Sequence, residues 1–366
     1  MADAPQATIT SHPTLFGGHR ALKLPPLTCH WLSAADGTTL RLYHAQGGTR
    51  GAVLLAPGTA MSGLSYCIDT VDENLAEYLV RAGFDVWLAD WRTSPELPAH
   101  TVPYSLDDVG RYDWPALVEY VRAAAKVERV SILSHCLSSP ALMLSLVRGH
   151  LDPSHVDAIV ASQVALHLEA DPLGKVKQWT HVASLLNAHE IIHQQPAEVT
   201  HSLADLAISS LAPILPHIPG SESCGNPVCA RHLATFGGLL NHERVNAETH
   251  ALMGPLIPEV VVGFLKAVAP IVLRIDLLEA DDLVHLDRFK VPITFVSGEH
   301  NHMFVPSGTE KSFDLLRQAN GDALYRRELI PGYGHLDCLI GANAAADVFP
   351  VFAEGLGPSI RAARGM

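Results

Sequence analysis

The stretch VSILSHCLS at residues 130–138 decides the fold of this chain. It opens with an apolar run at 130–133 that is typical of a buried strand, and apolar residues at three- and four-residue spacing from 141 to 147 predict a helix after it. Cys136 stands at the turn between them, with the small residues Ser134 and Ser138 two positions away on either side. A sharp strand-to-helix turn requires small neighbours, because larger side chains would collide there. The pattern predicts that Cys136 is presented at the carboxyl end of a strand.

Two roles compete for Cys136. Taken alone, it would be a small buried hydrophobic residue, as most free cysteines are. Its place at the turn, with a suitable histidine downstream, favours a nucleophile instead. The N-terminus of the following helix would stabilise a thiolate through its dipole, and a neighbouring imidazolium would do so further. We therefore expect Cys136 to react as a thiolate.

His335 is the expected general base and acid. The last predicted strand, residues 325–330, leads into a glycine-rich loop that carries this histidine. A loop after the final strand can bring a histidine across the sheet edge to the nucleophile.

The residue that orients His335 is expected after the preceding strand, residues 293–296. Asn301 stands three residues after Gly298, where a catalytic acid would be expected. Beside a cysteine nucleophile, an amide that fixes the orientation of the imidazole can suffice. Glu299 lies two residues earlier and stays open as the alternative. The sequence thus predicts a triad of Cys136, His335 and Asn301.

An oxyanion hole is expected from two backbone groups. The apolar run at residues 52–55 ends in the loop at residues 56–63, next to the predicted elbow. The N–H groups of Thr59 and of Leu137, the residue after the nucleophile, are the expected donors to a developing oxyanion.

Short apolar runs alternate with helical spacing along most of the chain, which predicts an α/β protein with a mainly parallel sheet flanked by helices. A hairpin around Asp36-Gly37 precedes this pattern. The predicted strands are residues 28–32, 39–43, 52–55, 86–88, 130–133, 158–164, 293–296 and 325–330, and the predicted helices are 73–82, 114–125, 141–147, 312–319 and 344–354.

The alternation stops after the sixth predicted strand and resumes only at residue 293. The segment between reads as helices and loops with many prolines, and we expect it to be a helical cap inserted into the core. The expected organisation is an N-terminal extension, a first core part, a cap and a second core part, at residues 1–27, 28–170, 171–287 and 288–366.

The composition and net charge of the chain exclude some classes of function. Apolar residues make up 48% of the chain and charged residues 17%, enough for a sizeable core. The net charge of −13 opposes the phosphate neutralisation on which nucleic-acid binding depends. No signal-peptide pattern and no membrane span are apparent, so a cytoplasmic location is expected. We expect no cofactor and no metal; Cys224 and Cys229 could pair as a disulfide or bind a metal, but no second cysteine pair accompanies them.

A competing motif is H-E-x-x-H at residues 189–193. On a helix it would place two histidines on one face beside a glutamate, as in zinc proteases. A third ligand would come from His201, Asp205 or His217, but these are candidates by proximity alone. We therefore do not expect zinc there.

Several segments resemble known families. Tyr104-Ser105-Leu106-Asp107-Asp108, the run YDWPA at 112–116 and GHLD at 334–337 resemble segments of the acid (gastric and lysosomal) lipases, which have the α/β-hydrolase fold. Closer is the resemblance to the α/β-hydrolase module that accompanies cholesterol-oxidase-like (GMC) flavin oxidoreductases; its pattern is matched by His135-Cys136, SQVA at 162–165, NPVC at 226–229 and IPGYGHLDC at 330–338.

The chain departs from the acid lipases at three places: a cysteine at the elbow, an asparagine at the acid position, and Ala56-Pro57 where those enzymes have a histidine before the glycine. The resemblance implies an acyl-transferring hydrolase with a hydrophobic small-molecule acyl substrate under its cap. We expect attack by Cys136 on an ester, lactone or thioester, through a thioester intermediate. The alternatives are an acyltransferase that resembles the polyhydroxyalkanoate synthases and a non-catalytic hydrophobic-ligand-binding partner of a flavin oxidoreductase.

Overall fold

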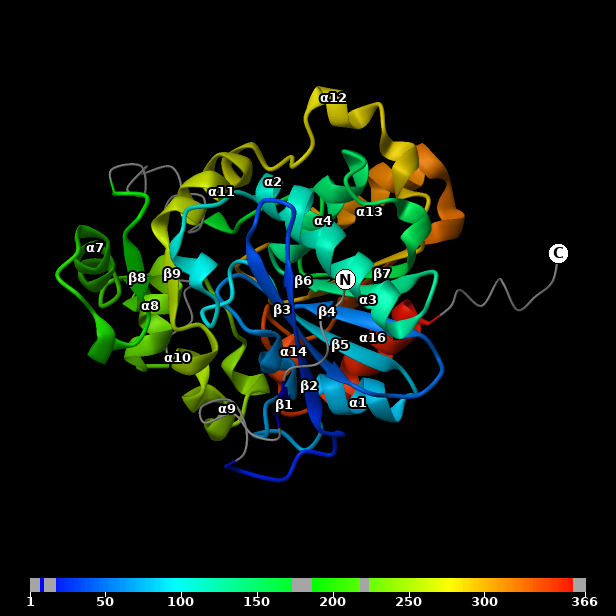
Figure 1. Cartoon of the computed structure of the whole chain (residues 1–366). Helices are drawn as coiled ribbons and strands as arrows, with labels where there is room; N and C mark the ends of the chain where they lie inside the picture. The colour runs from blue at the N-terminus through cyan, green and yellow to red at the C-terminus, as the bar shows by residue number, and fades with distance from the viewer. Residues whose placement is uncertain (1–6, 10–17, 173–185, 218–223, 358–366) are drawn as a thin grey trace.

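A nine-stranded sheet forms the centre of the protein (Figure 1). The computed structural model describes residues 7–9, 18–172, 186–217 and 224–357. Strands β5, β4, β6, β7, β10 and β11 are parallel, whereas β1, β2 and β3 join one edge in antiparallel pairs. In sheet order the strands are β1 (Ala7–Ile9), β2 (Leu27–Ser33), β3 (Thr39–Ala45), β5 (Asp85–Asp90), β4 (Ala52–Ala56), β6 (Val130–His135), β7 (Val156–Ser162), β10 (Ile293–Gly298) and β11 (Tyr325–Ile330).

The strands of the core follow from the apolar runs of the sequence. All five residues of β4 and all six of β6 are buried, as expected of strands covered on both faces. The predicted hairpin is present, since β2 pairs with β3 and Gly37 takes a positive φ of 86° in the turn. The strand β1 was not predicted, because three residues are too short for a recognisable period.

Helices cover both faces of the sheet. On one face, α1 (Leu75–Arg81) and α16 (Phe349–Leu356) pack together, and on the other lie α3 (Trp114–Ala125), α4 (Ser138–Val147) and α13 (Ser307–Asn320). The helix predicted at 344–354 is divided into α15 (Ala344–Asp347) and α16. Pro350 explains the division, because proline fits the first turn of a helix but not its interior.

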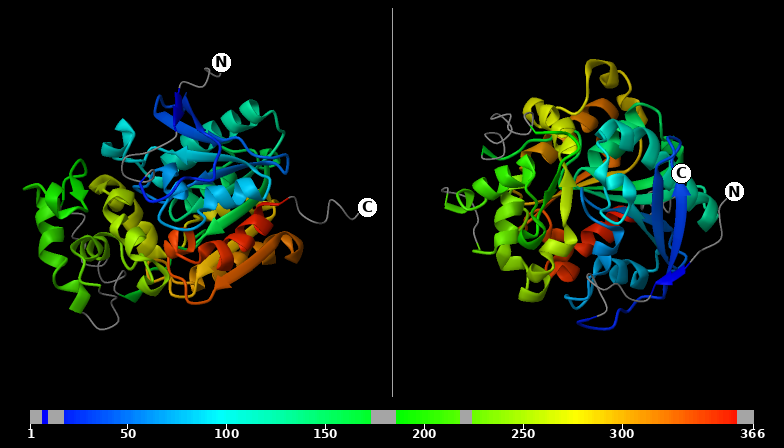
Figure 2. Two further views of the ribbon diagram at one scale, coloured as in Figure 1. Left: turned by 90° about the horizontal axis from the view of Figure 1, so that it is seen from below. Right: turned by 60° about the vertical axis from the view of Figure 1, so that its left-hand side comes forward.

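Residues 186–217 and 224–274, which we call the cap segment, form a lobe beside the core (Figure 2). Its two short strands pair as an antiparallel ribbon, although the sequence predicted only helices and loops there. The chain rejoins the core where Leu168 N–H donates to Ile275 O at 2.7 Å and Leu277 N–H donates to Leu166 O at 2.9 Å. The cap elements include β8 (Ile191–His193), α7 (Leu203–Leu211), α8 (Pro227–Thr235), η7 (His242–Arg244), α9 (Ala247–Ala251), α10 (Met253–Leu256), β9 (Glu259–Val261) and α11 (Val262–Arg274).

Among the described residues, no helix combines the length and the apolar character needed to traverse a bilayer.

Candidate active site

Cys136 lies at a strained turn between β6 and α4. Its φ is +55°, in the left-handed region that non-glycine residues rarely enter and that costs on the order of 1–3 kcal/mol. Hydrogen bonds fix the turn: Cys136 N–H donates to Ser162 O at 3.0 Å, and the Ser138 hydroxyl accepts from His135 N–H at 3.0 Å. The same hydroxyl lies 2.8 Å from His135 O, to which it donates. A small residue at 138 is therefore part of the turn, as the sequence predicted.

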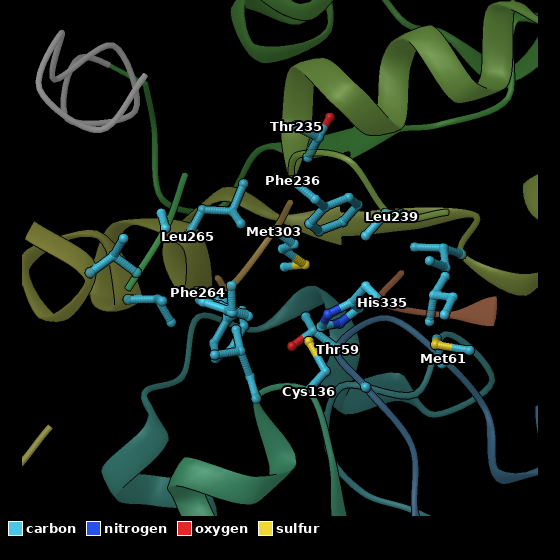
Figure 3. Close-up of a pocket in the computed structure, with 18 residues that line it drawn as sticks. Thr59, Met61, Cys136, Thr235, Phe236, Leu239, Phe264, Leu265, Met303 and His335 are labelled. Atoms are coloured by element: carbon cyan, nitrogen blue, oxygen red, sulfur yellow. The ribbon is translucent and has the colours of Figure 1, made fainter. Parts of the chain in front are cut away.

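Two backbone N–H groups, those of Leu137 and Thr59, lie close enough to the Cys136 sulfur to lower the pKa of its thiol. They are the two donors that the sequence analysis named for the oxyanion hole. The loop can approach this closely because Gly58 has no side chain; a Cβ there would lie 3.0 Å from the Cβ of Cys136. The buried Thr59 hydroxyl has no hydrogen-bond partner among the described residues, and it faces the sulfur in Figure 3. Sequence reasoning did not consider this hydroxyl, since only backbone groups were expected to act.

His335 lies on the loop after β11 and faces Cys136 across the site (Figure 3). The side chain is buried, with its Nδ1 3.3 Å from Asn301 Oδ1. Its Nε2 is also buried and has no hydrogen-bond partner among the described residues. One nitrogen is therefore oriented by the protein while the other is left for a group that enters the site.

Asn301 is held in one orientation by its neighbours. Its Oδ1 accepts hydrogen bonds from the N–H groups of Met303, at 3.2 Å, and Phe304, at 3.0 Å. Its Nδ2 donates to Oε1 of Gln163 at 3.0 Å and lies 3.4 Å from the Gln163 carbonyl oxygen. The amide oxygen is thus the atom that faces His335.

Glu299 is directed elsewhere. Its carboxylate accepts a hydrogen bond from Gly332 N–H at 2.9 Å, and its side chain is about half exposed. The structure therefore brings Cys136, His335 and Asn301 together and leaves Glu299 on the outer side of the same loop.

Gln163 is a supporting residue to which the sequence analysis gave no role. It follows β7 with a positive φ of 79°, and its Oε1 accepts from Gly298 N–H as well as from Asn301, both at 3.0 Å. It thus connects the β7 end to the β10 loop. The only sequence signal was the match of SQVA at 162–165 to a family pattern, which carries no information about contacts.

Burial sets the protonation of the reacting pair. It raises the pKa of the Cys136 thiol to about 12, and the N–H groups of Leu137 and Thr59 offset only part of this effect. Burial also lowers the pKa of His335 to about 3. Burial therefore favours a thiol and a neutral imidazole over the thiolate–imidazolium pair that the sequence predicts.

The pocket above Cys136 is apolar. Figure 3 shows that Phe236, Leu265 and Leu239 enter it from the cap side, opposite Cys136 and Thr59. None of the described residues that line it is an aspartate, glutamate, lysine or arginine. The further lining residues include Met61, Ala170, Thr235, Ile257, Phe264, Val268, Val272, Met303, Phe304 and Leu336.

The H-E-x-x-H motif does not form a helical zinc site. Ile191–His193 is the strand β8, so the two histidines do not share a helix face. His193 is engaged by carboxylates instead, with Nδ1 2.8 Å from Asp205 and Nε2 3.4 Å from Glu259. Glu190 accepts a hydrogen bond from Ala204 N–H at 2.8 Å. The motif ties β8 to its neighbours within the cap segment.

Several lipase-like residues support the site without lining it. Asp337 accepts hydrogen bonds from Gly334 N–H at 2.7 Å and from Asn241 N–H at 3.0 Å, and so joins the His335 loop to the cap segment. Asp113 is fully buried and pairs with Arg92 at 2.6 Å.

Comparisons with known proteins agree with this architecture. No family model matches the chain. Human (Homo sapiens) lipase member K is 21% identical over 358 residues, which cover 87% of this chain and 84% of that protein. A thermophilic esterase from Thermogutta terrifontis superposes with a TM-score of 0.54 at 14% identity, over 89% of this chain and 97% of that one. An esterase from Exiguobacterium antarcticum gives 0.52 at 12% identity, over 92% and 99%. The mainly parallel sheet, the elbow after β6 and these structural likenesses show that the chain has the α/β-hydrolase fold.

Proposed function

We propose that the protein is an acyl hydrolase in which Cys136 attacks the carbonyl carbon of a hydrophobic ester, lactone or thioester. The observation that carries the proposal is the elbow itself. Cys136 stands on a left-handed turn, and two backbone N–H groups lie close enough to its sulfur to lower the pKa of the thiol. A histidine whose Nε2 has no hydrogen-bond partner among the described residues faces it. A cysteine that only filled space would need none of these features. That the similar proteins are named as a lipase and as esterases also supports acyl chemistry.

Because the resting pair is neutral, His335 acts as a general base during the attack. Its Nε2 accepts the thiol proton as the sulfur bonds to the carbonyl carbon, and the negative charge moves to the carbonyl oxygen. The N–H groups of Thr59 and Leu137 donate to that oxyanion. The imidazolium donates from Nδ1 to Asn301 Oδ1, which stabilises it in place.

The proton on His335 is then used to release the leaving group, and the thioester is hydrolysed afterwards. His335 returns its proton to the departing alkoxide or thiolate, which leaves a thioester on Cys136. A water molecule then attacks the thioester carbonyl while Nε2 takes its proton. Collapse of the oxyanion breaks the carbon–sulfur bond, and the sulfur recovers the proton from His335. The products are an acid and an alcohol or thiol.

The lining of the pocket indicates the class of substrate. Burial of an acyl chain against Phe236, Leu239 and Phe264 would be favourable by about 25 cal/mol for each Å² of apolar surface removed from water. With no charged side chain among the described lining residues, a charged acyl group would gain no partner there. We therefore propose an uncharged hydrophobic acyl group.

Trapping of the acyl-enzyme tests the proposal. A panel of p-nitrophenyl esters of increasing chain length, acyl-CoAs and lactones identifies a substrate, and quenched reactions are then analysed by peptide mass spectrometry. We expect the acyl group on Cys136, released by neutral hydroxylamine as thioesters are. Cys136→Ala should abolish turnover, whereas the matched control Cys29→Ala, a buried cysteine on β2, should retain it. Turnover in Cys136→Ala would refute the proposal, and ester products with an added alcohol would indicate acyl transfer instead of hydrolysis.

A further inference from the structure

A second group of reactive side chains lies in the cap segment, among residues that do not line the pocket above Cys136. The potential ligand atoms of four residues lie within 4.8 Å of one another: Cys224, Cys229, His242 and His250. Both cysteines are free thiols, and their sulfurs lie 3.4 Å and 3.1 Å from Nε2 of His250. The rings of His242 and His250 are 5.2 Å apart, centre to centre. Two thiols and two imidazoles thus converge on one point.

These separations suit one ion. Zinc binds cysteine sulfur at about 2.3 Å and histidine nitrogen at about 2.0 Å in a tetrahedron, so that neighbouring ligand atoms are on the order of 3.3–3.8 Å apart. The measured sulfur–nitrogen distances are already near that range. Small side-chain rotations would complete the tetrahedron.

The backbone conformation before α8 positions the two cysteine ligands. Gly225 takes a positive φ of 72°, and the Asn226 side chain caps α8 by accepting a hydrogen bond from Val228 N–H at 2.9 Å. This turn sets Cys224 just before the helix and Cys229 in its first turn, on either side of the cap residue. Cys229 lies in α8, His242 opens η7 and His250 lies in α9, so three of the ligands come from three different elements and Cys224 comes from the turn before α8.

We propose that Cys224, Cys229, His242 and His250 form a structural zinc site. Four protein ligands fill a tetrahedral ion completely and leave no position for a substrate, which is the arrangement of structural rather than catalytic zinc. Binding releases the thiol protons and adds its free energy to folding.

The site has a structural consequence for the pocket. It would fasten the start of α8 to η7 and α9, while the other end of α8 supplies Thr235, which lines the pocket with the adjacent Phe236. The ion would therefore hold one wall of the substrate pocket. The inference does not rest on the chemistry of Cys136.

Metal analysis of the purified full-length chain tests the proposal. We expect one zinc per chain by inductively coupled plasma mass spectrometry, lost in Cys224→Ser and in His250→Ala but kept in His189→Ala, a matched control at the H-E-x-x-H motif. Replacement of zinc by Co²⁺ should give a thiolate-to-cobalt charge-transfer band and intense tetrahedral d–d bands, a readout that does not depend on activity. If the purified chain holds no metal, reduced protein should take up one Zn²⁺ from a competing chelator.

Three results would overturn the proposal. The first is reduced, folded protein that takes up no zinc. The second is zinc that is lost in His189→Ala but kept in His250→Ala, which would move the site to the other motif. The third is a Cys224–Cys229 disulfide in peptide maps of protein purified under reducing conditions. Should a variant fail to fold, the wild-type chain still tests the proposal. Chelation should lower its melting temperature, and added zinc should restore it.

Discussion

At the scale of single residues, the site selects an amide at position 301. From the sequence, an aspartate would serve His335 equally well, because it accepts the same hydrogen bond. In the structure, the Asn301 Nδ2 donates to Oε1 of Gln163 at 3.0 Å and lies 3.4 Å from the Gln163 carbonyl oxygen. A carboxylate would place a second oxygen against these two acceptors. The amide therefore both orients the imidazole of His335 and donates a hydrogen bond to Gln163.

We accordingly predict that Asn301→Asp impairs the enzyme. The loss of one buried hydrogen bond and the new repulsion should displace the carboxylate oxygen from His335 and cost on the order of 1–3 kcal/mol, or about 5- to 150-fold in kcat. KM should change little, because Asn301 does not line the pocket. Steady-state kinetics of Asn301→Asp and Asn301→Ala measure the effect. An aspartate variant as active as the wild type would contradict the hydrogen-bond pattern at Gln163.

A second prediction concerns the thiol itself. Since burial raises the pKa of Cys136 to about 12, the thiolate fraction should increase about tenfold for each pH unit between pH 6 and pH 10. Alkylation of Cys136 by iodoacetamide, followed by peptide mass spectrometry, should rise over this whole range. A preformed thiolate–imidazolium pair would instead give a rate that levels off near neutral pH. The shape of the pH profile distinguishes the two states, whereas the absolute rate does not, because burial slows the access of iodoacetamide to Cys136 at every pH.

At the scale of elements, the loop after β10 and the loop after β11 are fitted to each other through Gly298. A Cβ at this position would lie 2.2 Å from Gly334 O and 2.3 Å from Tyr333 O, on the loop that carries His335. We predict that Gly298→Ala displaces this loop and lowers the free energy of unfolding by about 1–3 kcal/mol, as overpacking typically does. Denaturant unfolding measures the loss, with Gly18→Ala as the control because nothing lies within 4 Å of its Cβ position. Equal stability of the two variants would contradict the prediction.

The elements also show what a sequence can predict and what it cannot. Core strands such as β4 and β6 can be predicted from the sequence, because a strand buried on both faces is an uninterrupted apolar run. The ribbon of β8 and β9 is three residues long on each side and has no period to recognise. Its register depends on tertiary contacts, which the sequence does not display.

The sequence likewise predicts only part of the site. Cys136, His335 and Asn301 could be named because parallel strands end at a common edge, which converts their order in the chain into proximity. Gln163 could not, because it acts through a backbone turn and an amide that follow no spacing rule. Nor could the cluster of Cys224, Cys229, His242 and His250, because only the tertiary fold brings the cysteine pair to the histidine pair.

At the scale of the whole molecule, the pocket is shared between the cap segment and the core. Cys136 and Met303 border it from the core, while Phe236 and Phe264 enter from the cap segment (Figure 3). Phe264 on α11 is fully buried and stacks on Tyr104 of the core at 4.6 Å between ring centres. The side chain that holds the cap segment against the core is thus also part of the pocket wall. Substrate selection and the docking of the two parts are therefore linked.

The linkage gives a prediction for Phe264→Leu. The smaller side chain should enlarge the acyl pocket and shift the maximum of kcat/KM toward longer or bulkier acyl chains, because each additional buried CH₂ contributes about 0.8 kcal/mol. The profile across p-nitrophenyl esters of increasing length measures the shift. Phe313→Leu is the matched control: Phe313 is a partly buried phenylalanine on α13 that contacts Phe295 and lies outside the pocket, so it should lose some stability but keep the wild-type profile. If both variants merely scale the profile downward by a constant factor, Phe264 acts through the stability of the fold and does not border the bound acyl chain.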